Sequence, residues 1–380
     1  MKIGLDFTPA IYGRGVSRYT LNLARALLGK SAAQLQLYGA SLRRHAALRH
    51  QAQQLGLSQA QLEKQVHFRR LPPTMMSGLW RLGLLPVKQA LPEIEVFHSW
   101  DWLQPPDKDL PLVSTIHDLA MLKHPETAHP RILKAHQRSW AVLQDREAEI
   151  IAVSQATKKD IVNLLNIPNF RVHVIPEALP DEIKTINENM TAQQAETIRE
   201  QLQLSRPYLL FVGTREPRKN LARLIEAWQP LAGELELLVA GAEGWDGTEG
   251  ESYEQLTGLR FLGPVSDAQL NILYAEAEAF VFPSLDEGFG LPILEAFYHG
   301  TPVIAADRPA MVEVAGNAAE LVDPESVEEI HRGIKTVLNE KAEEQRRRLQ
   351  RMIIRTHMFS WHQAAEQTLE VYQQAIKRHE

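Results

Sequence analysis

Residues 279–296 read Ala-Phe-Val-Phe-Pro-Ser-Leu-Asp-Glu-Gly-Phe-Gly-Leu-Pro-Ile-Leu-Glu-Ala. The first five residues are apolar and predict a buried strand, and Gly288 and Gly290 predict a tight turn after it. Pro292 suits the first turn of a helix, because the N–H that proline lacks has no helical partner there. The stretch therefore predicts a strand, a glycine turn and a helix, which is the unit from which doubly wound α/β domains are built.

Two carboxylates, Glu287 and Glu295, flank this turn. Free backbone amides and the positive end of the helix dipole at the turn favour a phosphate group. We expect Glu295 to accept hydrogen bonds from ribose hydroxyls and Glu287 to face a sugar, so the pattern predicts a nucleotide-sugar site. The alternative is that Glu287 is a solvated loop residue and Glu295 only complements the helix dipole. The spacing alone leaves both open.

The length of the chain, 380 residues, predicts two domains, because single cores stop growing at roughly 250–300 residues. Short apolar strands alternate with longer amphipathic segments, which predicts two doubly wound α/β domains. The predicted strands are 2–8, 35–39, 66–71, 96–99, 112–117, 150–154, 172–175, 208–213, 235–240, 260–262, 280–283, 303–306 and 320–322. A boundary is expected near residues 176–181, followed by one helix over 184–203, and a long helix is expected over 361–377.

Composition excludes several classes of protein. There are no cysteines, so disulfides, cysteine-ligated metals and thiol nucleophiles are excluded. The sequence has neither an apolar run long enough to span a membrane nor a signal peptide pattern, and a cytoplasmic location is expected. The net charge is −6, but residues 1–180 carry 22 Lys and Arg against 14 Asp and Glu.

The positive charge is concentrated in residues 41–90, which contain eight Lys and Arg and a single acidic residue, Glu63. Leucines, methionines and Trp80 accompany these cations. Basic and apolar residues with a tryptophan predict a surface that docks peripherally on an anionic membrane, and a solvated helix face with its apolar side in the core is the alternative. Nucleic acid is not an expected partner, because the whole chain is acidic.

A second cluster, residues 212–220, reads Val-Gly-Thr-Arg-Glu-Pro-Arg-Lys-Asn between a predicted strand and a predicted helix. Asn220 is the expected N-cap of that helix. Arg215 and Lys219 emerge at the carboxyl edge of a parallel sheet, where doubly wound folds bind ligands. A guanidinium and an ammonium together suit a diphosphate, although such residues are also common as solvated loop cations.

Two further clusters follow strands of the first domain. Residues 13–18 read Gly-Arg-Gly-Val-Ser-Arg, which matches a dinucleotide fingerprint only in part and suits a loop whose amides face a phosphate. Residues 114–118 end in His117 and Asp118, and His98 ends the preceding strand; histidine there can bind a sugar hydroxyl or carry a proton. The Asp107-Lys108-Asp109 triplet lies between prolines and is expected to be a surface turn rather than a metal site.

Together these clusters resemble the family-4 class of retaining glycosyltransferases, which have the GT-B architecture of two Rossmann-like domains facing across a cleft. The resemblance covers nearly the whole chain. It implies an N-terminal acceptor domain of residues 1–178 plus 362–380, with a returning helix, and a donor domain of residues 179–361. Its most specific parts are Gly213-Thr214 through Lys219-Asn220, the Glu287 and Glu295 pair, Pro302-Val303-Ile304, His117-Asp118, and Ala152-Val153-Ser154 before a helix.

The resemblance also implies roles for single residues. Arg215 and Lys219 hold the donor diphosphate, Glu295 holds the ribose, and Gly15 approaches the diphosphate from the other domain. The donor sugar and phosphate are contacted by Glu287, Phe289, Gly290 and Leu291. His117 touches the transferred sugar, and His98, Asp118 and Ser154 lie on the acceptor side. In this sequence Glu177-Ala178-Leu179 replaces the Asn-Gly that often follows Ile-Pro in the family.

The implied activity is transfer of a hexose from a nucleotide sugar to a glycan or lipid-linked acceptor in envelope or exopolysaccharide synthesis, without a cofactor or a metal. A UDP-glucose type of donor is the first choice and GDP-mannose the second. A sugar-nucleotide epimerase of the same fold and a non-catalytic nucleotide-binding protein are the alternatives.

Overall fold

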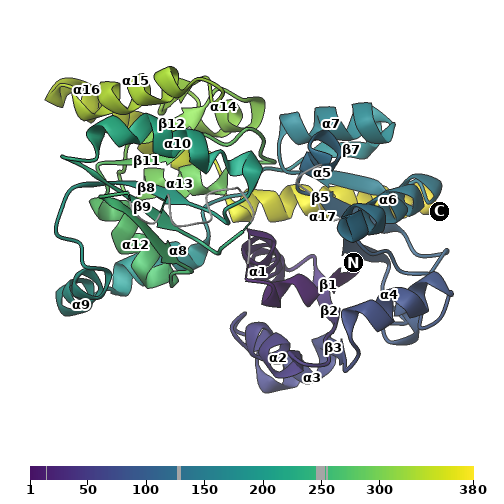
Figure 1. The fold of residues 1–380 in the computed structure, drawn as a ribbon. Helices are drawn as coiled ribbons and strands as arrows, with labels where there is room; N and C mark the ends of the chain where they lie inside the picture. Colours follow the sequence, from purple (N-terminus) through teal and green to yellow (C-terminus); the bar gives the residue numbers. More distant parts are fainter. Residues whose placement is uncertain (14, 126–129, 245–252, 254–255) are drawn as a thin grey trace. The chain divides into compact units, whose positions relative to one another are not determined.

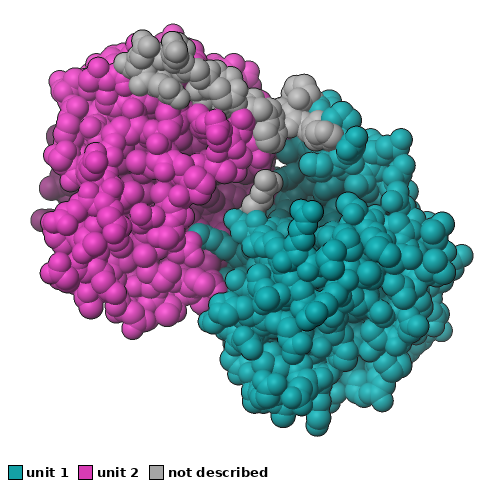
Figure 2. All heavy atoms as spheres, turned by 60° about the horizontal axis from the view of Figure 1, so that its bottom comes forward, with its two compact units in different colours: residues 1–177, 360–380 teal, residues 178–359 magenta. Residues whose placement is uncertain are grey.

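The computed structural model describes residues 1–13, 15–125, 130–244, 253 and 256–380. The chain folds into two compact units (Figure 2). Unit 1 contains residues 1–177 and 360–380, and unit 2 contains residues 178–359. Each unit is built on its own parallel sheet, so the predicted fold class of two doubly wound domains is confirmed (Figure 1).

The sheet of unit 1 has seven parallel strands in the order β3-β2-β1-β4-β5-β6-β7. Their bounds are β1 Lys2–Asp6, β2 Gln34–Ala40, β3 Val66–Arg69, β4 Val96–Trp100, β5 Leu112–Ile116, β6 Glu149–Ala152 and β7 Val172–Val174. In the central strand β1, Leu5 aligns with Leu37 of β2 and with His98 of β4. The strand order reverses beside β1, and doubly wound sheets bind ligands at the carboxyl ends of strands at such a point.

Helices cover both faces of this sheet. Their bounds are η1 Thr8–Ile11, α1 Gly15–Leu28, α2 His45–Gln53, α3 Gln59–Gln65, α4 Pro73–Arg81, η2 Val87–Gln89, α5 Ala120–Lys123, α6 Pro130–Asp145, α7 Gln155–Leu165, η4 Asn169–Arg171 and α17 Trp361–His379. Helix α17 packs against α1, β4, β5 and β6 (Figure 1). Trp80 of α4 and Trp140 of α6 belong to one buried apolar cluster together with residues of α7.

The sheet of unit 2 has six parallel strands in the order β10-β9-β8-β11-β12-β13. Their bounds are β8 Tyr208–Val212, β9 Glu236–Ala240, β10 Leu259–Gly263, β11 Ala279–Phe282, β12 Val303–Ala306 and β13 Glu320–Val322. Every strand predicted from the sequence is present in one of the two sheets. The strand order reverses between β8 and β11, so the loops that follow these two strands lie at the expected ligand position.

The helices of unit 2 are α8 Asp181–Asn189, α9 Ala192–Leu202, η5 Pro217–Lys219, α10 Leu221–Trp228, η6 Gln229–Leu231, α12 Asp267–Glu276, α13 Leu291–Tyr298, α14 Pro309–Ala315, α15 Val327–Leu338 and α16 Ala342–His357. Helices α10 and α15 pack together over one face. The single helix predicted over 184–203 is wrong. Thr191 and Gln194 form a capping box that starts α9 as a separate helix, since each side chain accepts a backbone N–H of the other residue.

No helix within the described ranges is long and apolar enough to cross a membrane.

Candidate functional site

Residues 279–296 fold as predicted into strand β11, a turn and the first part of helix α13. Gly290 is the residue before α13 and has φ of 101°, a conformation that side chains with a Cβ rarely adopt. Phe289 is buried and packs edge-on against Phe359, with 5.4 Å between ring centroids, and Leu291 is also buried. The turn is therefore held rigidly, and the first amides of α13 lie at the carboxyl edge of the sheet.

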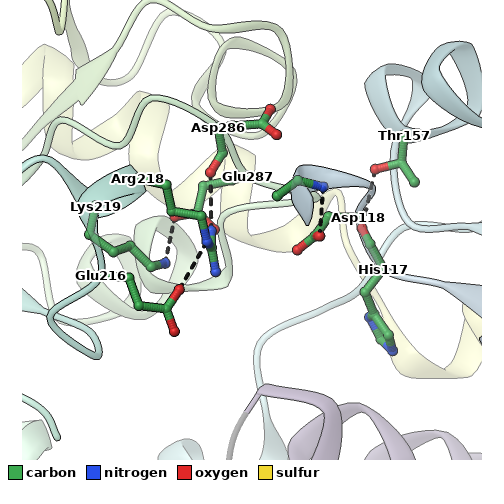
Figure 3. Close-up of polar contacts among 9 residues, drawn as sticks. His117, Asp118, Thr157, Glu216, Arg218, Lys219, Asp286 and Glu287 are labelled. Atoms are coloured by element: carbon green, nitrogen blue, oxygen red, sulfur yellow. Dashed lines mark hydrogen bonds and ion pairs between the residues drawn. The ribbon is translucent and has the colours of Figure 1, made fainter. Parts of the chain in front are cut away.

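Glu287 lies in this turn and forms a partly buried ion-pair cluster, with 10% of its side chain exposed (Figure 3). Its Oε1 is 2.5 Å from Lys219 Nζ, and its Oε2 is 3.0 Å from Arg218 Nη1. Burial by itself raises the pKa of the Glu287 carboxyl, but the charges of Lys219 and Arg218 outweigh burial and lower that pKa to about 2. The prediction that Glu287 is only a solvated loop residue is therefore wrong.

Arg218 is a member of this cluster that the sequence reasoning missed. It donates hydrogen bonds to Glu216 at 3.1 Å, to the backbone carbonyl of Asp286 at 3.1 Å and to Glu287. Arg215, which was predicted to hold the diphosphate together with Lys219, contacts other side chains. Its guanidinium is 4.7 Å from the centroid of Phe261 and 3.4 Å from Glu243.

The reason lies in the path of the loop. Residues Pro217–Lys219 form the short helix η5, and Asn220 then takes the left-handed conformation with φ of 62°. This turn directs Arg218 and Lys219 toward the β11 loop. Asn220 is the N-cap residue of α10, as predicted, but its side chain makes no cap hydrogen bond, because its amide donates to the carbonyls of Pro283 at 3.0 Å and Pro324 at 2.6 Å. Asn220 thereby ties three loops together at one edge of the sheet.

Glu295 lies on α13 and is buried, with only 3% of its surface exposed. The hydroxyl of Tyr274 donates a hydrogen bond to Glu295 Oε2 over 3.1 Å. Glu295 lies beyond the first turn of α13, and a buried carboxylate there must be satisfied by hydrogen bonds. The geometry fits an acceptor for hydroxyl donors, which is the role predicted for Glu295.

In unit 1, His117 follows strand β5 at the carboxyl edge of the sheet. Its Nδ1 is 3.1 Å from the Glu177 carboxylate, and its ring meets Tyr19 edge-on at 4.8 Å. Burial lowers the pKa of His117, but the hydrogen bond and the charge of Glu177 outweigh it, and the net shift of that pKa is upward. The Nε2 atom of His117 is buried and has no hydrogen-bond partner among the residues that the structure describes.

The residues predicted on the acceptor side occupy different places. His98 is fully buried between Tyr372, whose hydroxyl is 2.6 Å from its Nδ1, and Thr115, 2.8 Å from its Nε2. Burial lowers the pKa of His98 to about 3, so this ring is a neutral core residue. Ser154 is fully buried and caps α7 by accepting the N–H of Thr157 at 3.0 Å. The predicted acceptor contacts of His98 and Ser154 are therefore wrong, because no substrate reaches the core.

Asp118 is half-buried and accepts the N–H of Ala120 at 3.0 Å at the start of α5 (Figure 3).

Gly15 begins α1, and nothing lies within 4 Å of the place where a Cβ would stand. The loop before it is closed by Ser17, whose hydroxyl donates to Pro9 at 2.6 Å and accepts the N–H of Gly13 at 2.8 Å. Arg14 lies outside the described residues.

The Asp107-Lys108-Asp109 triplet serves the local structure. Asp107 is buried and accepts the N–H groups of Val87 at 2.7 Å and Lys88 at 2.9 Å, and Asp109 pairs with the side chain of Lys88. Within the described ranges, no three His, Asp or Glu side chains converge as metal ligands.

The basic stretch 41–90 divides into buried and exposed parts. Trp80 is 5% exposed, and its indole N–H donates to the carbonyl of Leu85 at 3.1 Å. The prediction that Trp80 contributes to a membrane-facing surface is wrong, because this side chain packs against Tyr38 and Phe97. The exposed apolar residues of the α4 region are Met75, Leu82 and Leu84, and the exposed cations of the stretch are Arg43, Arg44, Arg49, Lys64, Arg70 and Arg81.

Comparisons with known proteins agree with this geometry. The chain matches the family model described as Glycosyltransferase Family 4 over residues 13–182, and that of Glycosyl transferases group 1 over residues 194–355. The O-antigen chain mannosyltransferase B of Escherichia coli is 31% identical over 278 residues, which cover 68% of this chain and 69% of that protein.

Solved structures share the fold at low identity. A sucrose-phosphate synthase from Thermosynechococcus elongatus superposes with a TM-score of 0.72 and 18% identity over 100% of both chains. Anabaena Alr3699/HepE in complex with UDP-glucose superposes with a TM-score of 0.71 and 18% identity over 98% of this chain and 99% of that one.

Proposed function

The chain belongs to the group 1 glycosyltransferases of family 4 and is a hexosyltransferase of the GT-B class, and from this premise we propose that it moves a hexose from a nucleoside diphosphate sugar to a glycan acceptor. The observation that carries the proposal is the partly buried Glu287 cluster. Two cations, Lys219 and Arg218, meet one carboxylate directly beside the glycine turn that opens α13. This combination provides both phosphate and sugar contacts at one sheet edge.

In the transfer reaction these groups stabilise the charge that develops in the transition state. The bond between the anomeric carbon and the diphosphate breaks, negative charge grows on the departing phosphate, and positive charge grows on the sugar ring. Lys219, Arg218 and the amides of α13 face the growing negative charge and lower the barrier. The acceptor oxygen bonds to the anomeric carbon, and its proton passes to the leaving phosphate. Retention follows from attack on the same face, without a covalent enzyme nucleophile.

Glu287 has two parts in this scheme. Its carboxylate pairs with Lys219 and Arg218, the two cations that the diphosphate needs. With donor bound, the diphosphate takes over part of this role, and Glu287 accepts hydrogen bonds from the sugar hydroxyls. Glu295 accepts hydrogen bonds from the ribose. Arg215 remains a proposed outer contact to the diphosphate, and His117 offers its Nε2 to the transferred sugar.

For the donor we propose a mannosyl nucleotide such as GDP-mannose, because the relative at 31% identity is named as a mannosyltransferase. UDP-glucose is the second candidate, supported by the complex of a structural neighbour with that donor at 18% identity. The residues of the site select the sugar, and the overall fold does not. The relative at 31% sequence identity is therefore the stronger guide to the donor than the structural neighbour at 18%.

The test is nucleotide-sugar binding and turnover with the purified chain. Calorimetry with UDP, GDP, UDP-glucose and GDP-mannose is expected to give binding of one nucleotide family, and Lys219→Ala is expected to weaken it at least tenfold. Release of nucleoside diphosphate that requires no acceptor and yields an epimerised nucleotide sugar would replace the proposal by an epimerase. Binding of none of the four ligands would refute it.

We also propose that the exposed part of stretch 41–90 brings the enzyme to an anionic membrane that carries its acceptor. Each Lys or Arg near such a surface contributes about 1 kcal/mol, and six exposed cations accompany the exposed side chains of Leu82 and Leu84. Binding of this kind is reversible and depends on salt.

Co-sedimentation with anionic and neutral vesicles at low and high salt tests this surface. We expect binding only to anionic vesicles at low salt, with loss on changing Arg43, Arg44 and Arg70 to Gln. The matched control changes the exposed Arg332 and Arg347 of unit 2 to Gln, which should leave binding unchanged. Equal binding to both vesicle types would refute the attraction to anionic lipid, and binding to neither would exclude the membrane as a partner.

A further inference from the structure

A cavity of about 1390 Å³ opens in unit 1 at the carboxyl edge of its sheet and continues beneath two helices. Helix α6 contributes Arg131, Ala135, Arg138, Val142 and Asp145, and helix α4 contributes Pro73, Ser77 and Arg81. The α6 residues recur every three or four positions and form one stripe of the helix. Among the described residues, all that line the cavity belong to unit 1.

The mouth of the groove combines a carboxylate with aromatic rings. Asp6 ends strand β1, is 5% exposed, and accepts the N–H of Thr8 at 2.9 Å, which leaves capacity for further donors. Trp102 and Tyr12 both line the cavity, their ring centroids lie 6.1 Å apart, and 41% of Tyr12 is exposed. Aromatic faces beside a hydrogen-bonding carboxylate match a sugar ring, which has apolar C–H faces and a rim of hydroxyls.

A row of rings connects this mouth to His117. Trp100 stacks on His117 at 6.1 Å between centroids and on Trp102 at 6.2 Å. The indole N–H of Trp100 donates to the backbone carbonyl of Asp6 at 2.7 Å. The groove mouth and His117 therefore lie on either side of the buried Trp100 ring.

The side chain of Gln104 holds the loop that carries Trp102 in place. Gln104 donates from its amide to the carbonyl of Trp100 at 2.7 Å and to the hydroxyl of Ser139 at 2.9 Å, and it accepts from Ser99 at 2.5 Å. These bonds join the loop to β4 and to α6. A ring fixed in this way loses little conformational entropy when it binds a ligand.

The dimensions decide between a small and an extended ligand. The volume exceeds the roughly 300–1,000 Å³ of ordinary small-molecule pockets. The α6 stripe from residue 131 to residue 145 spans about 21 Å at 1.5 Å per residue. Arg138 of α6 and Arg81 of α4 supply donors for hydroxyls along this length. We propose that the groove binds several sugar units of an extended oligosaccharide acceptor, with its terminal sugar stacked on Trp102 and hydrogen-bonded to Asp6.

This inference rests on the proposed function, because it assigns the acceptor of the same reaction. It excludes a single sugar or a phosphorylated monosaccharide as the preferred acceptor, since either would leave most of the groove empty. Burial raises the pKa of the Asp6 carboxyl to about 6, so the carboxylate form prevails at pH values above that.

The experiment measures transfer to manno- and gluco-oligosaccharides of one, two and four units and to mannose 6-phosphate. We expect kcat/KM to rise at least tenfold from one unit to four in the series that is used. Trp102→Ala and Asp6→Asn should remove most of this gain with length, and Trp102→Phe should restore part of it. Leu164→Ala, an exposed apolar residue of α7 outside the groove, should behave like the wild type.

Two integrity checks accompany the variants. Their melting temperature and their Kd for UDP or GDP, measured by calorimetry, report on the fold and the donor site. A variant that keeps both and loses the length dependence supports the groove. Equal kcat/KM for one and four units, preference for the sugar phosphate, unchanged length dependence in Trp102→Ala, or donor turnover without transfer to any of these oligosaccharides would overturn the inference. Absence of nucleotide binding would instead refute the proposed function.

Discussion

The cluster around Glu287 predicts that Arg218, and not Arg215, is the guanidinium on which transfer depends. Arg218→Ala removes hydrogen bonds to Glu216, to the Asp286 carbonyl and to Glu287, all between 3.0 and 3.1 Å. Removing one preorganised donor from developing negative charge costs about 2.7–4 kcal/mol, so kcat should fall about 100- to 1,000-fold. Lys219→Ala should cost at least as much.

Stability should change less than turnover. Hydrogen bonds to charged groups contribute about 1.5–3 kcal/mol, and the Arg218 side chain is 18% exposed, so solvent screens part of that. A loss of about 2 kcal/mol corresponds to a fall in Tm of about 4–8 °C for a unit of this size. The variant therefore remains folded at 25 °C, where its kinetics can be measured.

The assay is release of nucleoside diphosphate at saturating donor and acceptor, with thermal melts of each variant in parallel. Arg215→Ala serves as the matched comparison, since it removes the same side chain from the same loop and is expected to lose less than tenfold. Wild-type turnover in Arg218→Ala, or a larger loss of turnover in Arg215→Ala than in Arg218→Ala, would refute the assignment of Arg218 as the guanidinium on which transfer depends.

Three further outcomes are expected. In Glu177→Gln the raised pKa of His117 should move down, because the carboxylate charge that opposes burial is lost; an unchanged NMR titration midpoint would contradict this. Because the pKa of Glu287 is lowered, its ion pairs stabilise the fold fully above a pH of about 4.5, and this stabilisation is lost as the pH falls toward 2. In Glu287→Gln the free energy of unfolding should therefore depend less on pH in that window. Parallel curves of unfolding free energy against pH for the variant and the wild type would contradict this. Activity should survive excess EDTA, since Lys219 and Arg218 carry the positive charge, and a loss restored by Mg²⁺ or Mn²⁺ would show that an ion is needed.

The strands and the β11 turn could be predicted because their signals are local. Apolar runs of four to six residues and the glycines at 288 and 290 report on the backbone of the same residues. Lys219 and Glu287 were found in the same way, as polar residues directly after strands. Arg218 was missed, because its partners Asp286 and Glu287 lie 68 and 69 positions later in the chain.

The errors at His98 and Trp80 have a common physical cause, which is contact between segments distant in sequence. His98 is buried beneath Tyr372, 274 positions later in the chain. Trp80 is covered by Tyr38 and Phe97, which come from two strands. Residue type and position relative to a strand end do not predict such contacts. For the same reason the sequence did not predict the hydrogen bond between His117 and Glu177, which lie 60 positions apart.

Helix α17 has a consequence for how the protein is made. Residues 178–359 form one uninterrupted unit, so the ribosome delivers that unit whole and it can fold as soon as it emerges. Unit 1 is delivered first in sequence, yet Tyr372 and the rest of α17 reach its sheet only after all of unit 2 has been translated. Until then the β4 and β5 face that surrounds His98 lacks its cover. The first half of the chain must therefore wait, with apolar surface open to chaperones, for the helix that completes it.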